Sequence, residues 1–147
     1  MTSTVSPPQP APNKLTSFYW DALTRHELEI LRCQDCGFYV HYPRPICNKC
    51  LSTNLAPERV SGRGKLYTYT WAAQAFHPYY VDKIPYCIAV VELEEQAGLR
   101  VTSNVIDCAR EDVKMGMDLE VTFVDAPGRQ TLAMFRPAGS TTQEAGK

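Results

Sequence analysis

Hydrophobic and polar residues alternate along the second half of the chain with the two-residue period of β-strands. In the first such run, residues 64–73, one face carries Lys65, Tyr67, Tyr69 and Trp71. Four more strand-like runs follow, at residues 85–94, 99–106, 119–124 and 130–135. Turn residues, mostly Gly and Pro, separate the runs, and residues 107–113 favour a short helical turn. Five short strands in this order predict a small barrel of the OB type, in a mainly β protein.

A helical period precedes the strands. Residues 15–28 carry an apolar stripe that begins at Phe18, and Thr16 or Ser17 is placed to cap the start of the helix. The stripe is short, so the predicted helix is amphipathic and needs another surface to cover it.

Three aromatic residues in that helix allow two interpretations. Phe18, Tyr19 and Trp20 either pack the helix onto its own domain or contact another subunit. Aromatic side chains are enriched in the cores of protein interfaces, and a short helix has little core of its own to cover. Both interpretations remain open from the sequence.

Composition changes abruptly at the two ends of the chain. Residues 1–13 contain four prolines and residues 138–147 are small and polar, so both are expected to be disordered or extended tails. The remainder divides into residues 14–56, with the helix and all closely spaced cysteines, and residues 57–137, with the barrel strands.

The overall composition is that of a soluble globular protein. The chain has 147 residues, 44% of them hydrophobic, and a formal net charge of −1, which disfavours a broadly cationic surface for nucleic acid. No apolar run approaches the roughly 20 residues of a membrane-spanning helix, and the N-terminus lacks the pattern of a secretory signal. We therefore expect a cytoplasmic protein, in which paired cysteines bind metal more often than they form disulfides.

Four cysteines carry the most specific chemical signal. Cys33 and Cys36 form one C-x-x-C pair, and Cys47 and Cys50 form a second pair after a gap of ten residues. Each pair can direct two thiolates at one ion, and four thiolates suit tetrahedral Zn²⁺. Iron or a redox disulfide are the alternatives. A four-thiolate site has no open coordination position, so we expect one structural metal ion per chain.

The other reactive residue types have no partner in the local sequence. Cys87 and Cys108 lie in or beside strand-like runs and are interpreted as small buried thiols. His26, His41 and His77 have no ligand or base nearby in the sequence. The chain also contains none of the common nucleophile or phosphate-binding motifs, so no catalytic set is predicted.

Taken together, the motifs resemble those of a known family, the acyl-CoA-associated OB-fold proteins with an N-terminal rubredoxin-like zinc ribbon. The resemblance covers residues 15–137 and is carried by residues 18–23, 29–37, 43–50, 61–64, 67–70, 85–93, 115–117 and 135–137. All four cysteine positions of the family are filled here, by Cys33, Cys36, Cys47 and Cys50.

The resemblance implies that the chain is a non-catalytic partner. Family members bind thiolase-like enzymes as small subunits of hetero-oligomers, here expected to be a heterotetramer, and help to form the acyl-CoA channel. In its full cysteine set, proline-rich tail and free-standing form, the chain is most similar to the partners of retro-aldolases in steroid side-chain degradation. Thiolase or acyltransferase complexes are the next expectation. In such a family Arg44 and Arg63 are candidate contacts for a CoA phosphate.

Two other functions are weighed against this one. Zinc ribbons and OB folds also occur in proteins that bind single-stranded nucleic acid, but residues 64–73 and 99–106 supply only Lys65 and Arg100 as cations. A stand-alone enzyme acting on CoA thioesters would need Cys87, Cys108 or His77 to be reactive.

Overall fold

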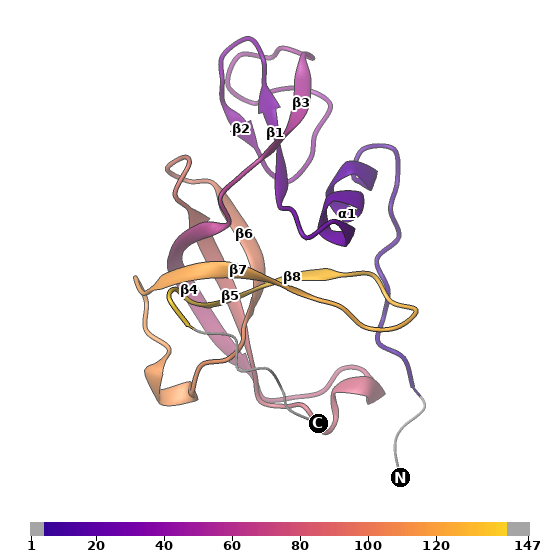
Figure 1. Ribbon diagram of the computed structural model, residues 1–147, viewed down its shortest axis with the longest axis vertical. Helices are drawn as coiled ribbons and strands as arrows, with labels where there is room; N and C mark the ends of the chain where they lie inside the picture. The colour runs from indigo at the N-terminus through magenta and orange to yellow at the C-terminus, as the bar shows by residue number, and fades with distance from the viewer. Residues whose placement is uncertain (1–4, 141–147) are drawn as a thin grey trace.

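The computed structural model describes residues 5–140 as a helix, a small sheet and a barrel (Figure 1). The small sheet stands at one end of the barrel, and the helix lies beside the junction of the two. The predicted tails at 1–13 and 138–147 fall partly outside this range, because residues 1–4 and 141–147 are not described. Within residues 5–140 no helix is long and apolar enough to cross a membrane.

The helix is shorter than the sequence predicts. Helix α1 spans Ser17–Thr24 rather than residues 15–28. The Thr16 side chain makes no capping hydrogen bond; instead the Asn13 side chain accepts hydrogen bonds from the backbone N–H groups of Leu15 and Thr16, at 2.9 and 3.1 Å. The helix ends because His26 adopts the left-handed conformation, with φ +57°.

The small sheet has the strand order β2-β1-β3, with β1 at Glu29–Cys33, β2 at Tyr39–Val40 and β3 at Leu55–Arg59. Strand β2 follows the first cysteine pair and returns alongside β1. Strand β3 is not predicted from the sequence, since Pro57 interrupts the strand pattern. This proline is tolerated because β3 pairs only with β1, at the edge of the sheet. The sheet has its own small core, formed by Leu31, Cys33, Val40 and Cys47.

All five predicted barrel strands are confirmed. They are β4 (Arg63–Ala72), β5 (Tyr86–Leu93), β6 (Arg100–Val105), β7 (Asp118–Val124) and β8 (Leu132–Pro137). They close in the order β4-β5-β6-β8-β7. Alternate residues of β5 are buried, as the period of two requires. Short 3₁₀ helices η1 (Pro78–Tyr80) and η2 (Arg110–Asp112) lie in two connections, the second within the predicted turn at residues 107–113.

One glycine allows the barrel to close. Gly64 pairs with both Leu93 of β5 and Leu119 of β7. A Cβ atom at this position would lie 2.3 Å from the backbone oxygen of Glu92. The neighbouring strand therefore approaches closely only because residue 64 has no side chain.

The described part of the N-terminal segment is an extended chain along the barrel. Gln9 accepts a hydrogen bond from the backbone N–H of Gln130, at 3.0 Å. Prolines of the segment line a cavity of about 250 Å³ together with Tyr79 and Tyr80. Residues in this segment are thus placed by contacts with the β7–β8 connection and with η1.

Candidate metal centre

Two similar turns carry the four cysteines. In each turn the residue after the second cysteine donates a backbone hydrogen bond to the carbonyl oxygen of the first cysteine. Gly37 N–H donates to Cys33 and Leu51 N–H donates to Cys47, both at 2.9 Å. Both residues have positive φ, +76° at Gly37 and +65° at Leu51. Glycine adopts this conformation freely, whereas leucine adopts it at a cost. The tight turns direct both sulfur atoms of each pair to the same side.

The four sulfur atoms fit one tetrahedral ion. They lie within 4.8 Å of one another, with Sγ–Sγ distances of 3.5 Å between Cys33 and Cys50 and 3.7 Å between Cys36 and Cys47. Thiolates at about 2.3 Å from a central zinc would be about 3.8 Å apart. Cys33 and Cys47 are buried, while Cys36 and Cys50 are exposed. The donor set and its spacing therefore suit a four-thiolate metal site.

Backbone groups favour the thiolate forms of Cys33 and Cys47. Hydrogen bonds from the backbone at Cys36, and then Asp35, lower the pKa of the Cys33 thiol to about 6 despite partial desolvation. The backbone N–H groups of Cys50 and Lys49 lower the pKa of Cys47 in the same way. N–H donors aimed at sulfur stabilise the charged form that binds metal.

Side chains outside the turns hold the two halves of the cluster together. Asp35 accepts hydrogen bonds from the Ser52 hydroxyl and from the Asn54 amide, the latter at 3.2 Å. Arg32 donates to the Gly37 carbonyl at 2.9 Å and pairs with Glu58 at 2.9 Å. These contacts join the first cysteine turn to the second and to β3, so they fix the sulfur positions as well as the fold.

The three aromatic residues of α1 pack on this chain and also reach its surface. Phe18 contacts the core of the small sheet, whereas Tyr19 and Trp20 contact the barrel core. All three remain partly exposed. The helix thus joins the two cores, and part of each of these aromatic side chains meets solvent.

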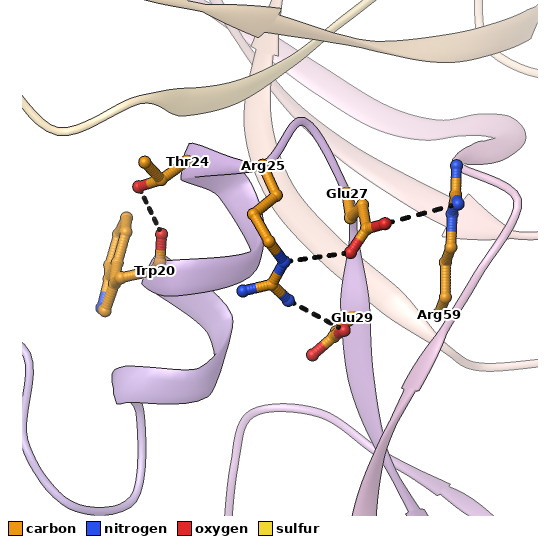
Figure 2. A network of polar contacts seen from close by, with 6 residues as sticks. All are labelled: Trp20, Thr24, Arg25, Glu27, Glu29 and Arg59. Atoms are coloured by element: carbon orange, nitrogen blue, oxygen red, sulfur yellow. Dashed lines mark hydrogen bonds and ion pairs between the residues drawn. The ribbon is translucent and has the colours of Figure 1, made fainter.

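A chain of ion pairs ties the end of α1 to the small sheet (Figure 2). Arg25 contacts Glu27 at 3.3 Å and Glu29 at 3.2 Å, and Arg59 of β3 reaches Glu27 at 3.5 Å. In the last turn of the helix, the Thr24 hydroxyl donates a hydrogen bond to the Trp20 carbonyl oxygen at 3.2 Å. Exposed pairs of this kind contribute under about 1 kcal/mol each, so they orient the helix more than they stabilise it.

The two arginines singled out in the sequence lie in different parts of the fold. Arg44 is exposed in the loop between β2 and Cys47. Arg63 begins β4 and pairs with Glu94, at 2.9 Å, on the wall of a cavity of about 640 Å³. A phosphate at Arg63 would have to share or displace the Glu94 carboxylate.

Two histidines have surroundings that the sequence analysis did not find. His26 lies 2.6 Å from Asp125, whose other oxygen accepts from Thr131 at 2.6 Å. Both ring nitrogens of His41 are buried without a hydrogen-bond partner in the described part of the chain. Neither arrangement has a local sequence signal, since His26 and Asp125 are 99 residues apart.

Comparison with known proteins gives two family-model matches. Residues 20–56 match the family described as "ChsH2, rubredoxin-like zinc ribbon domain". Residues 57–124 match "ChsH2, C-terminal OB-fold domain". The first match covers the four cysteines and the second covers β4 to β7, so the closed five-stranded barrel is an OB fold.

Similar proteins include enzyme subunits and a scaffold protein. A "probable enoyl-CoA hydratase alpha subunit" of Thermomonospora curvata is 34% identical over 89% of this chain and 40% of its own length. A "DUF35 domain-containing scaffold protein" of Methanocaldococcus jannaschii is 40% identical over 63% of this chain and 64% of its own. The chain therefore spans less than two thirds of each of these relatives.

A solved structure is similar over nearly its whole length. A chain of the "Ltp2-ChsH2(DUF35) aldolase" superposes with a TM-score of 0.79 and 32% sequence identity, over 88% of this chain and 99% of that one.

Proposed function

The chain belongs to the ChsH2 (DUF35) family of zinc-ribbon and OB-fold proteins, and on that premise we propose that it is a non-catalytic subunit of a thiolase-like acyl-CoA enzyme. In this role it stabilises the catalytic subunit in a hetero-oligomer, with a heterotetramer as the expected form. Its own surface helps to shape the acyl-CoA site at the interface.

One observation carries the proposal: the likeness to the Ltp2-ChsH2(DUF35) aldolase extends over 88% of this chain and 99% of that one. A likeness confined to the barrel would indicate only a widely used fold. Because the match covers almost the entire other chain, the likeness extends well beyond the barrel, and this supports a shared role as a docking subunit.

The protonation states of the other candidate nucleophiles and bases support a non-catalytic role. Burial raises the pKa values of the Cys87 and Cys108 thiols, which keeps both as weakly nucleophilic thiols at neutral pH. Burial lowers the pKa of His41 to about 4, so this ring is a weak base. The aldol or thioester chemistry is accordingly assigned to the partner.

We assign the metal centre to one structural Zn²⁺ per chain, held by Cys33, Cys36, Cys47 and Cys50. The four thiolates and their spacing support tetrahedral zinc with no open position. Cysteines held as metal-binding thiolates suit a reducing compartment, which is why we place the assembly in the cytoplasm.

The partner surface is proposed to include the exposed edges of Phe18, Tyr19 and Trp20. A partner seated on α1 would cover aromatic surface that the chain itself leaves partly exposed. Arg44 and Arg63 are proposed as contacts for a CoA phosphate, Arg44 the more readily because Arg63 is paired with Glu94.

The reaction of the assembly is proposed to be a retro-aldol cleavage in steroid side-chain degradation, with thiolase or acyltransferase chemistry as the next choice. The word aldolase in the name of the similar structure supports the first choice. The hydratase alpha subunit of Thermomonospora favours a second candidate, a subunit of an acyl-CoA hydratase. The two candidates differ in the catalytic subunit that this chain would bind.

Co-expression tests the proposal. The chain is produced with a thiolase-like protein from the same organism and, separately, with a hydratase from that organism. Each product is analysed by size-exclusion chromatography with metal analysis. We expect a stable complex with the thiolase-like protein that contains one zinc per copy of this chain. A complex with the hydratase alone would favour the second candidate.

A matched variant tests the interface. Trp20→Ala should weaken the complex more than it lowers the melting temperature of the isolated chain. The reverse order would mean that Trp20 serves only the chain's own core. If the chain forms no complex with either enzyme but binds oligonucleotides with an affinity that falls steeply with salt, it would instead be a nucleic-acid-binding protein.

A further inference from the structure

A small cavity lies where the helix, the small sheet and the barrel meet. It encloses about 180 Å³. Its wall consists of Thr16, Tyr19, Trp20, His41, Tyr42, Pro43, Val101 and Thr102. These described residues come from α1 and the residue before it, from the segment after β2, and from β6. None of them carries a formal charge. The cavity is therefore an uncharged pocket at a three-way junction.

His41 is a residue of this wall whose polar atoms lack hydrogen-bond partners in the described part of the chain. Neither ring nitrogen is reached by solvent, and residues 5–140 offer no hydrogen-bond partner to either one. The ring is neutral at pH 7, with one N–H donor and one acceptor nitrogen. Buried polar atoms normally have partners, because leaving them unpaired lowers stability. An unpaired imidazole in this position indicates a partner group that the chain itself does not contain.

Two tyrosines enclose the imidazole, and one of them is placed to move. The Tyr42 ring lies over His41, with ring centroids 4.2 Å apart, and is 56% exposed. Tyr19 lies on the inner side, at 6.1 Å, and packs against the barrel core. Because the outer face of Tyr42 meets solvent, this ring can turn without disturbing either core.

We propose that this cavity receives one carboxamide side chain, an Asn or Gln, from the partner enzyme, which hydrogen-bonds to a ring nitrogen of His41 after the Tyr42 ring turns aside. The proposal rests on the partner role proposed above. It makes the cavity a specificity site of the interface, adjoining the exposed edges of Tyr19 and Trp20.

The chemistry of the wall selects this occupant. A charged group would enter a site without a counter-charge and lose its hydration, whereas an apolar group would leave the imidazole unpaired. A carboxamide carries its donor and its acceptor on separate atoms, so it can pair with the imidazole in either tautomer. It also fills more of the cavity than the hydroxyl side chain of Ser or Thr, which has the same pairing ability. The volume, roughly that of six water molecules at about 30 Å³ each, accommodates one such side chain.

The test uses the full chain and its co-expressed thiolase-like partner. His41→Phe preserves a flat ring and removes both polar atoms, so we expect an unchanged or higher melting temperature for the isolated chain and at least tenfold weaker assembly. Thr102→Leu, which fills the cavity from β6 without altering His41, should weaken assembly in the same way and serves if His41→Phe folds poorly. Met115→Leu, at an exposed residue outside the cavity wall, is the control and should assemble normally.

Nitrogen-15 NMR of the imidazole rings provides a second readout. The His41 signals should shift when the partner is added, and those of His77, outside the cavity, should not. Wild-type assembly of both cavity variants, with an unshifted His41, would overturn the proposal and identify the cavity as a site for ordered water. Failure of the wild-type chain to assemble would refute the partner role itself, and this proposal with it.

Discussion

The side-chain amide of Gln96 pairs with both backbone polar groups of Tyr39. Its oxygen accepts from the Tyr39 N–H at 2.8 Å, and its nitrogen donates to the Tyr39 carbonyl at 3.1 Å. Gln96 lies between β5 and β6, and Tyr39 lies in β2. The Gln96 side chain thus makes the two hydrogen bonds with Tyr39 that a neighbouring strand would make, and it joins the small sheet to the barrel.

Replacing this amide should loosen the junction. We expect Gln96→Ala to lower the free energy of unfolding by about 1–2 kcal/mol, because two backbone groups of Tyr39 lose their partners. Urea unfolding measures the loss, and hydrogen exchange should show faster exchange at the Tyr39 amide. Gln74→Ala, at an exposed loop position, is the matched control. Unchanged exchange at Tyr39 would mean that the amide pair does not join the two parts.

Removing one thiolate should unfold the small sheet and leave the barrel folded. Metal binding at four-thiolate sites supplies about 10–16 kcal/mol of apparent free energy. The core of the small sheet contains two of the cysteines, whereas most of the residues in the larger core belong to the barrel. We expect Cys33→Ser to lose its metal ion and the NMR dispersion of residues 29–59, measured beside elemental analysis. Cys108→Ser, outside the cluster, should keep both. A Cys33→Ser protein with a full equivalent of zinc and a native small sheet would contradict the ligand assignment.

Two glycines should respond differently to the same substitution. Gly64→Ala should destabilise the barrel by about 3 kcal/mol, because the new Cβ would meet the Glu92 backbone at 2.3 Å. Gly98→Ala should cost only about 1 kcal/mol: its φ of +81° is unfavourable for alanine, but the site is open. Thermal unfolding of both variants gives the comparison. Equal losses would show that close strand approach at Gly64 is not the limiting contact.

Acid should weaken the contact between α1 and the β7–β8 hairpin. Hydrogen bonds from Thr131 and then His26 hold the pKa of Asp125 below its ordinary value. A lowered pKa in the folded state contributes stability that is present above the ordinary aspartate pKa of about 3.9 and lost as pH falls through the folded value.

Asp125→Asn isolates this contribution. Urea unfolding at several pH values between 5 and 2 should show that the advantage of the wild-type chain over the variant shrinks as the pH falls. Asp21→Asn, at an exposed helix position, controls for the general loss of negative charge. An advantage that stays constant down to pH 2 would mean that Asp125 titrates alike in the folded and unfolded chains.

Features with a local period were predictable, and those formed by distant residues were not. The five barrel strands follow from alternation over consecutive residues, and the four-cysteine cluster follows from two C-x-x-C pairs. Strand β3 is not predicted because Pro57 interrupts its pattern, although a proline is tolerated in an edge strand. The helix was overextended because its end depends on the backbone at His26, which no apolar period encodes.

The sequence by itself determined the mainly β architecture, the four-cysteine cluster and the family resemblance, because each depends on residue types at short and regular spacings. Only the tertiary structure decided how the parts are joined, through Gln96 on Tyr39, His26 on Asp125, and the cavity around His41. These contacts bring together residues 57 and 99 positions apart in the first two cases. Which residues meet in these contacts depends on where the strands and loops lie in the folded chain. That placement is set by packing in three dimensions and not by short-range spacing.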